Sequence, residues 1–151
     1  MWEINGLPLH PLIVHAAVVF GPLAAASALA YVGLPKHRDK LRWVTLVVVV
    51  IAFLSIWAAY LSGDNFLENA PQFENLGGDA KEKIEHHEEL AGVLRWMTTG
   101  FALVTVLAVW QHARVGAARY ALGGLVVVGA ILTLVWTALT GDAGAQAVWG
   151  S

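Results

Sequence analysis

The sequence predicts an all-α integral membrane protein, a four-helix bundle made of two helical hairpins that repeat in parallel. Three observations support this prediction: an apolar composition, four apolar stretches of membrane-spanning length, and a partial repeat between the two halves. Of the 151 residues, 58% are hydrophobic and 13% are charged, whereas soluble domains carry about a quarter charged residues. The composition therefore argues against a soluble fold.

Each apolar stretch has about the 20 residues that a helix needs to cross a hydrocarbon core. Continuous apolar runs without alternation indicate helices, and a helix satisfies its own backbone polar groups in lipid. We expect a single transmembrane domain over residues 1–151, with spans at 12–34, 44–62, 90–110 and 120–140 and a long connection at 63–89.

Charge divides the predicted bundle into two sides. The connections 35–43 and 111–119 hold six of the nine Lys and Arg residues, and the other side collects ten of the eleven acidic residues. Basic loops stay in the cytoplasm, so we expect both termini and the connection 63–89 to face outward. Trp43 and Trp110 should then mark the inner membrane interface.

The two halves of the chain resemble each other. Each hairpin opens with histidines, turns through a basic loop, and ends in a Leu-Ser/Thr-Gly-Asp phrase, at residues 61–64 and 139–142. Because glycine commonly follows the last helical residue, we expect the second and fourth helices to end at Gly63 and Gly141. Parallel repeats place shared sites at their interface. We therefore expect the outer ends of the first and third helices to be neighbours, with the two endings in equivalent positions.

Small residues favour close helix packing in this bundle. Ala17, Gly21 and Ala25 recur at i+4 spacing in the first helix, a pattern that lets helix backbones approach closely. The third helix should begin near Asp79, whose segment through Glu82 has the form of a helix N-terminus with an acid at the third position.

Histidines stand at the outer mouths of two spans, His10 and His15 in the first and His86 and His87 in the third. Ionisable groups at a membrane span are candidates for function. An imidazole that faced lipid would lose its hydrogen bonds, so we expect His15 and His87 to turn inward and approach each other. A hydrogen-bonded structural role is the alternative for His10 and His15, and His86 is expected to be solvated.

Arg95 lies on the same helical stripe as His87, two turns further along. It is about 7 Å inside the apolar run at 1.5 Å per residue and requires an anionic partner or a polar cavity. The candidate partners are Asp64, Glu88, Asp142 and a haem propionate, and an ion pair with one of the aspartates is the structural alternative.

Several functional classes lack support in this sequence. A zincin motif fails because Ala91 stands four residues after His87, and no serine lies in a recognisable nucleophile elbow. The chain has no cysteine, which excludes disulfides, thiolate metal sites and covalent c-type haem. The basic loops carry no nucleic-acid motif. Whether the protein is an enzyme is left open.

Three segments carry a family resemblance: GLPLHPLIVH at 6–15, a His-x-x-Leu helix start at His87, and GDAGAQAVWG at 141–150. Over nearly its whole length the chain resembles the bacterial domain of unknown function 2231 family of four-span membrane proteins. The resemblance implies a bacterial plasma membrane location. Relatives fused to Rieske-type or cytochrome-like domains imply redox partners, and His10, His15 and His87 match the family pattern. The family's C-terminal phrase is closer to G-x-S-G, from which Ala143 departs.

Three hypotheses follow for the function. The first is an electron-transfer module holding one b-type haem, with His15 and His87 as axial ligands and Arg95 near a propionate. The second is a divalent metal site in which His10, His15 and His87 combine with a carboxylate. The third is a non-catalytic accessory subunit of a larger respiratory membrane complex with structural histidines. Besides the lipid bilayer, the expected partners are a redox membrane complex or further copies of the chain, with no nucleic acid.

The orientation can be tested with cysteines introduced into this cysteine-free chain. A cysteine at Gly77 should react with an impermeant thiol reagent added outside intact cells, because the acidic side faces outward. A cysteine at His37 should react only after the cells are opened. The reverse labelling pattern would contradict the orientation.

Overall fold

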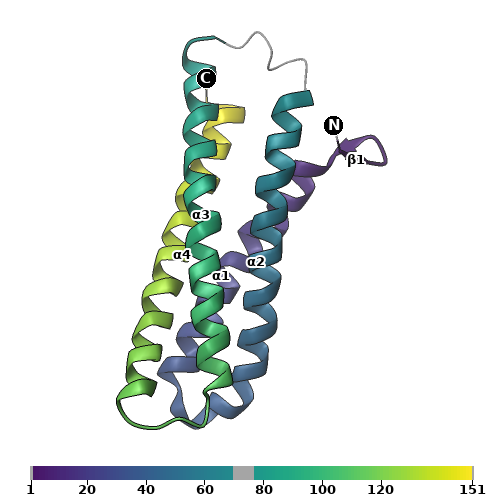
Figure 1. Cartoon of the computed structure of the whole chain (residues 1–151). Helices are drawn as coiled ribbons and strands as arrows, with labels where there is room; N and C mark the ends of the chain where they lie inside the picture. The colour runs from purple at the N-terminus through teal and green to yellow at the C-terminus, as the bar shows by residue number, and fades with distance from the viewer. Residues whose placement is uncertain (1, 70–76, 151) are drawn as a thin grey trace.

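The computed structural model describes residues 2–69 and 77–150. Its four long helices are α1 (Leu9–Gly33), α2 (Arg38–Asn69), α3 (Asp79–Trp110) and α4 (Ala117–Trp149). A 3₁₀ turn, η1 (Pro35–His37), precedes α2, and a short hairpin of β1 (Glu3–Ile4) and β2 (Leu7–Pro8) precedes α1. All four helices are long and apolar enough to cross a membrane. The predicted fold class is confirmed: the protein is an all-α, four-helix membrane bundle (Figure 1).

The helices pack mainly within two hairpins. α1 packs most extensively on α2 and α3 on α4, and the pairs α1/α4 and α2/α3 join the hairpins. α1 and α3 therefore lie at opposite corners, and the prediction that they are neighbours is wrong. Short loops place consecutive antiparallel helices side by side, which leaves parallel helices on the diagonals. The two hairpins thus pack in a similar way, with α1 on α2 corresponding to α3 on α4.

The two ends of the bundle differ in their residues. We call the end that carries both termini, His10 and His87 the histidine end, and the opposite end, with η1 and residues 111–116, the basic end. The two hairpins diverge toward the histidine end, where α1 and α2 separate from α3 and α4 (Figure 1).

α2 and α4 run past the predicted endpoints. They continue to Asn69 and Trp149, so Gly63 and Gly141 lie inside helices and the predicted C-caps are wrong. The polar residues beyond these glycines mark the end of the apolar segment but not of the helix. α3 does begin at Asp79, although Gly78 is its N-cap and Asp79 pairs with Lys83 instead of capping.

Small residues let the helices approach closely, as predicted for α1. A Cβ at Gly21 would lie 2.9 Å from Thr137 Oγ1 on α4. The main buried cluster is rich in alanine and extends over all four helices; it comprises Ala24, Ala25, Ala28, Tyr31, Val49, Ala52, Phe101, Ala102, Ala108, Val109, Val126 and Ala130. A smaller cluster of Ala17, Ile56 and Leu94 lies closer to the histidine end.

The N-terminal hairpin was not predicted. Asn5 and Gly6 both have positive φ, 53° and 77°, the requirement for the two-residue turn that Asn-Gly favours. The backbone N–H of Leu9 donates to Trp2 O over 2.9 Å, and the Trp2 N–H donates to Asn65 Oδ1 over 2.9 Å. The hairpin thereby ties the start of α1 to α2.

Replacing Gly129 with alanine should destabilise the α3–α4 pair. Its Cβ would lie 3.2 Å from Phe101 Cα, and a helix backbone cannot yield as a side chain can, so we expect a loss of about 1–3 kcal/mol. Thermal unfolding in detergent measures the effect. Gly124→Ala is the matched control, because its Cβ would meet nothing within 4 Å; equal effects of the two substitutions would contradict this packing.

Candidate functional site

His10, in the first turn of α1, lies against α2. Its Nδ1 is 3.0 Å from Ala59 O and 3.2 Å from Ser62 Oγ. The ring lies on the helix surface at Gly63, where a Cβ would come within 3.1 Å of the imidazole Cε1. The Phe66 ring stacks nearby, with centroids 6.1 Å apart. The glycine at 63 lets the ring lie this close to the α2 backbone, since an added Cβ would crowd the imidazole.

His87 makes the same contact in the second hairpin. Its Nδ1 is 3.0 Å from Thr140 O on α4, and a Cβ at Gly144 would come within 2.9 Å of its Cε1. In both hairpins the glycine follows the accepting carbonyl by four residues, one helical turn.

The match between the repeats differs from the predicted one. Gly63 corresponds to Gly144, one turn beyond Gly141, and a Cβ at Gly141 would meet nothing within 4 Å. The prediction that the Leu-Ser/Thr-Gly-Asp endings are equivalent is therefore wrong. Both endings mark the point where an apolar segment becomes polar, but the two glycines in them do not make the same contact with a histidine. Under the corrected match, Ser62 corresponds to Ala143, so only His10 has a hydroxyl beside its Nδ1.

Both imidazoles have a defined tautomer. A carbonyl oxygen only accepts hydrogen bonds, so Nδ1 of each ring must carry the hydrogen. In the neutral ring the lone pair then lies on Nε2, and no hydrogen bond to either Nε2 is present within residues 2–69 and 77–150. A histidine that ligates a metal commonly has this arrangement, with Nδ1–H on a carbonyl and Nε2 free.

The two anchored imidazoles come from diagonal helices and lie close enough for their charges to interact. Asp64 also interacts electrostatically with His10, and Glu88 with Asp64. Among the residues that the structure describes, no three His, Asp or Glu side chains are placed to hold one metal ion. The pair is thus a two-imidazole site with carboxylates in its surroundings.

His15 lies apart from this pair. It is exposed on the bundle surface, and its Nδ1 is 2.6 Å from Pro11 O in its own helix. The expectation that His15 turns inward toward His87 is wrong, because the Pro11 carbonyl satisfies the ring locally. His86 is exposed, as expected.

Arg95 lies among aromatic rings. Its guanidinium carbon is 3.8 Å from the centroid of Tyr60 and about equally far from Trp57 and Trp96, at 5.4 and 5.5 Å. None of the three expected carboxylates, Asp64, Glu88 or Asp142, pairs with it in the described part of the chain, and cation–π contacts surround the guanidinium instead. Its Nε is buried without a hydrogen-bond partner.

Two further polar atoms are buried near His87 on α4. Thr140 Oγ1 and Trp136 Nε1 have no hydrogen-bond partner among the described residues. Trp136 packs against the cluster of Ala17, Ile56 and Leu94 from the other three helices, so its ring points into the bundle. An indole N–H and a hydroxyl therefore remain available for hydrogen bonding below the imidazole pair.

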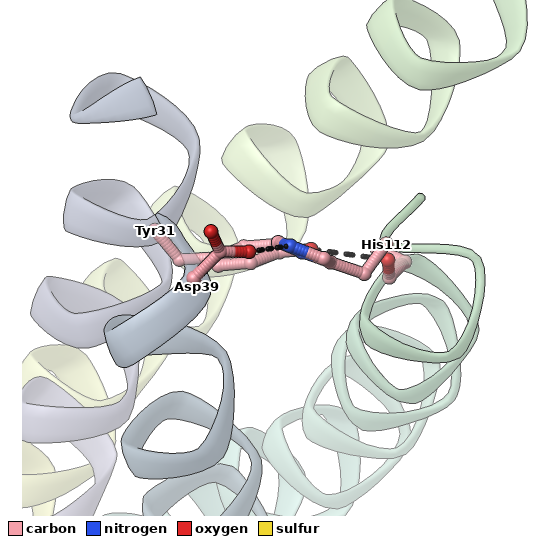
Figure 2. A network of polar contacts seen from close by, with 4 residues as sticks. Tyr31, Asp39 and His112 are labelled. Atoms are coloured by element: carbon pink, nitrogen blue, oxygen red, sulfur yellow. Dashed lines mark hydrogen bonds and ion pairs between the residues drawn. The ribbon is translucent and has the colours of Figure 1, made fainter. Parts of the chain in front are cut away.

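A second polar cluster, at the basic end, was missed by the sequence analysis. Tyr31, Asp39 and His112 come from α1, α2 and the α3–α4 connection and form one hydrogen-bonded network (Figure 2). The sequence signal was a histidine two residues after the last residue of α3, at a helix end where a cation is favoured.

Gly144→Ala should displace the His87 ring from Thr140 O, because the added Cβ would lie 2.9 Å from Cε1. We expect a lower thermal unfolding temperature and altered ¹⁵N chemical shifts of the His87 imidazole. Gly141→Ala is the control and should leave both unchanged. An unaltered His87 spectrum in Gly144→Ala would contradict the contact.

Comparisons with known proteins agree with this architecture. No curated protein and no solved structure matches the chain. A family described as "Predicted membrane protein (DUF2231)" matches residues 6–151. The chain therefore belongs to the DUF2231 family of predicted membrane proteins.

Proposed function

We propose that His10 and His87 are the axial ligands of one b-type haem and that the protein is a membrane electron-transfer module. The supporting observation is the matched anchoring of the two rings, each with Nδ1–H on a carbonyl and Nε2 free. Two neutral imidazoles from facing helices are a usual axial pair for haem iron, and cofactor sites are commonly built in bundle cores from facing helices. This assignment replaces His15 by His10.

The two proposed ligands come from different hairpins. They lie on α1 and α3, which occupy a diagonal of the bundle. Each ring is held by its own hairpin, through Gly63 or Gly144. Each ring is therefore held in place by its own hairpin, which would favour binding of a group at the free Nε2 atoms.

Arg95 supplies the positive charge that a haem propionate would need. Its guanidinium lies over the ring of Tyr60. Tyr60 directly follows Ala59, whose carbonyl oxygen accepts the hydrogen bond from His10. Arg95 and His10 therefore contact α2 at neighbouring residues. Its buried, unpaired Nε is an available donor. Thr140 and Trp136 add two further donors beside His87. When bound, a haem would supply one-electron chemistry at its iron.

The orientation follows from the charged residues. With the basic end in the cytoplasm, the site lies near the extracytoplasmic face of a bacterial plasma membrane and both termini lie outside. A redox membrane complex, or another copy of the chain, is the partner class that an electron-transfer module requires.

A divalent metal is the second candidate. It is favoured by Asp64 and Glu88, whose carboxylates interact electrostatically with each other at the histidine end. Imidazole together with carboxylate suits zinc, iron or copper(II). The first candidate is stronger because two imidazoles complete the axial coordination of a haem, whereas a bare ion requires more ligands than the described residues bring together.

The haem assignment is tested by absorbance titration of the purified protein in detergent with haemin. We expect one haem per chain, with the spectrum of bis-imidazole iron in both oxidation states. His10→Ala and His87→Ala should each abolish that spectrum, because one axial ligand is lost. His15→Ala and His86→Ala are matched controls and should retain it, because both rings are exposed.

Three outcomes would overturn the assignment. Loss of the spectrum in His15→Ala but not in His10→Ala would show that the wrong histidine has been chosen. Binding of zinc or copper that depends on His10 and His87, without haem binding, would favour the metal site. Stability losses in the His10 and His87 variants without any bound cofactor would favour an accessory subunit with structural histidines.

A further inference from the structure

The network at the basic end connects the two hairpins (Figure 2). Tyr31 and Asp39 belong to the first hairpin, and His112 follows the first helix of the second. His112 Nε2 is 2.6 Å from Asp39 Oδ1, and its Nδ1 is 3.2 Å from the Tyr31 hydroxyl. The Tyr31 side chain is fully buried.

Tyr31 also caps α3. Its hydroxyl donates to Ala108 O over 3.1 Å. Ala108 O is one of the last carbonyls of α3, and the His112 N–H that would serve it in a continued helix donates to Val109 O instead. A buried carbonyl without a donor is unfavourable, so the Tyr31 hydrogen is needed at Ala108.

The hydrogen-bond partners of His112 determine which of its two ring nitrogens carry a hydrogen. Because the Tyr31 hydrogen goes to Ala108 O, the Tyr31 oxygen can only accept from Nδ1, which must therefore carry a hydrogen. The Asp39 carboxylate also only accepts, so Nε2 carries a hydrogen as well. The complete network requires both ring hydrogens, that is, an imidazolium.

We infer that His112 is a proton-binding site on the basic face of the bundle and that the bound proton locks the two hairpins together there. On deprotonation, Nδ1 becomes an acceptor and competes with Ala108 O for the single Tyr31 hydrogen. One of the two bonds is then lost, and with it part of the connection between α1 and the end of α3.

Other charged groups surround the network. Arg38 and Arg42 of α2 and Arg119 of α4 all act on Tyr31 electrostatically, and the Arg38 guanidinium lies 4.7 Å from the Tyr31 ring centroid. Asp39 is the carboxylate that faces them and His112. The hydrogen bond from His112 lowers the pKa of the Asp39 carboxyl, which lies in the first turn of α2 outside the apolar segment. The carboxylate therefore stays ionised into mild acid.

The sign of the pH dependence follows. The complete network, with both Tyr31 bonds and the bond to Asp39, is present only while His112 carries both ring hydrogens. The contribution of Asp39 is present at neutral pH and is lost only in acid, below the ordinary range of an aspartate.

The test measures the separation of the hairpins at the basic end by electron–electron spin resonance. Spin labels are attached to cysteines at Lys40 and Val115, both exposed and on different hairpins, in the full chain in lipid nanodiscs. We expect a narrow distance distribution at pH 6 that broadens at pH 9. The thermal unfolding temperature should be lower at pH 9 than at pH 6 by about 2–4 °C.

Two variants and a control accompany the test. His112→Asn should show the broad distribution at both pH values. Tyr31→Phe keeps the buried ring but removes the competing hydroxyl, so its pH dependence should shrink even if its stability falls. His37→Asn, an exposed histidine beside the network, should behave like the unmodified protein. Equal distributions at both pH values in the unmodified protein, or pH dependence retained in His112→Asn, would overturn the inference.

Discussion

The same interaction joins the two helices of each hairpin at the histidine end. An imidazole of the first helix lies against a glycine of the second helix. Its Nδ1–H donates to the backbone carbonyl one helical turn before that glycine. In lipid an imidazole N–H has no water to serve it, so it must find an acceptor inside the chain. Glycine at 63 and 144 lets each ring lie close against the backbone of the neighbouring helix. This contact places the hydrogen on Nδ1 of each ring and leaves Nε2 free.

The fold was largely predictable, because composition and span length are global properties that neighbouring contacts hardly alter. The ends of the helices were not. Gly63 and Gly141 look like terminators in sequence, yet both lie within helices. A helix that leaves the membrane continues into water whenever polar residues support it. The Asn5-Gly6 turn was in principle recognisable, since both residues readily adopt positive φ.

The candidate site was only partly predictable. His87 was singled out by its place at a span mouth, and His15, not His10, was expected to be its companion. That choice depends on the local carbonyl of Pro11, which satisfies His15, and on Gly63, which admits His10. Arg95 illustrates the same limit, since a buried cation indicates a partner without specifying whether it is a carboxylate or an aromatic ring. The Tyr31–His112 network joins residues 81 positions apart, and the position of His112 after the end of α3 does not by itself indicate its partners.

The two histidine anchors agree in their carbonyl and glycine contacts but differ in their other neighbours. Ser62 Oγ lies 3.2 Å from His10 Nδ1, whereas Ala143 occupies the corresponding position beside His87. Near His87 the hydroxyl of Thr140 and the indole N–H of Trp136 are unpaired instead. A group held between the two imidazoles, as proposed above, would therefore meet different hydrogen-bonding surroundings on its two sides and would have a preferred orientation.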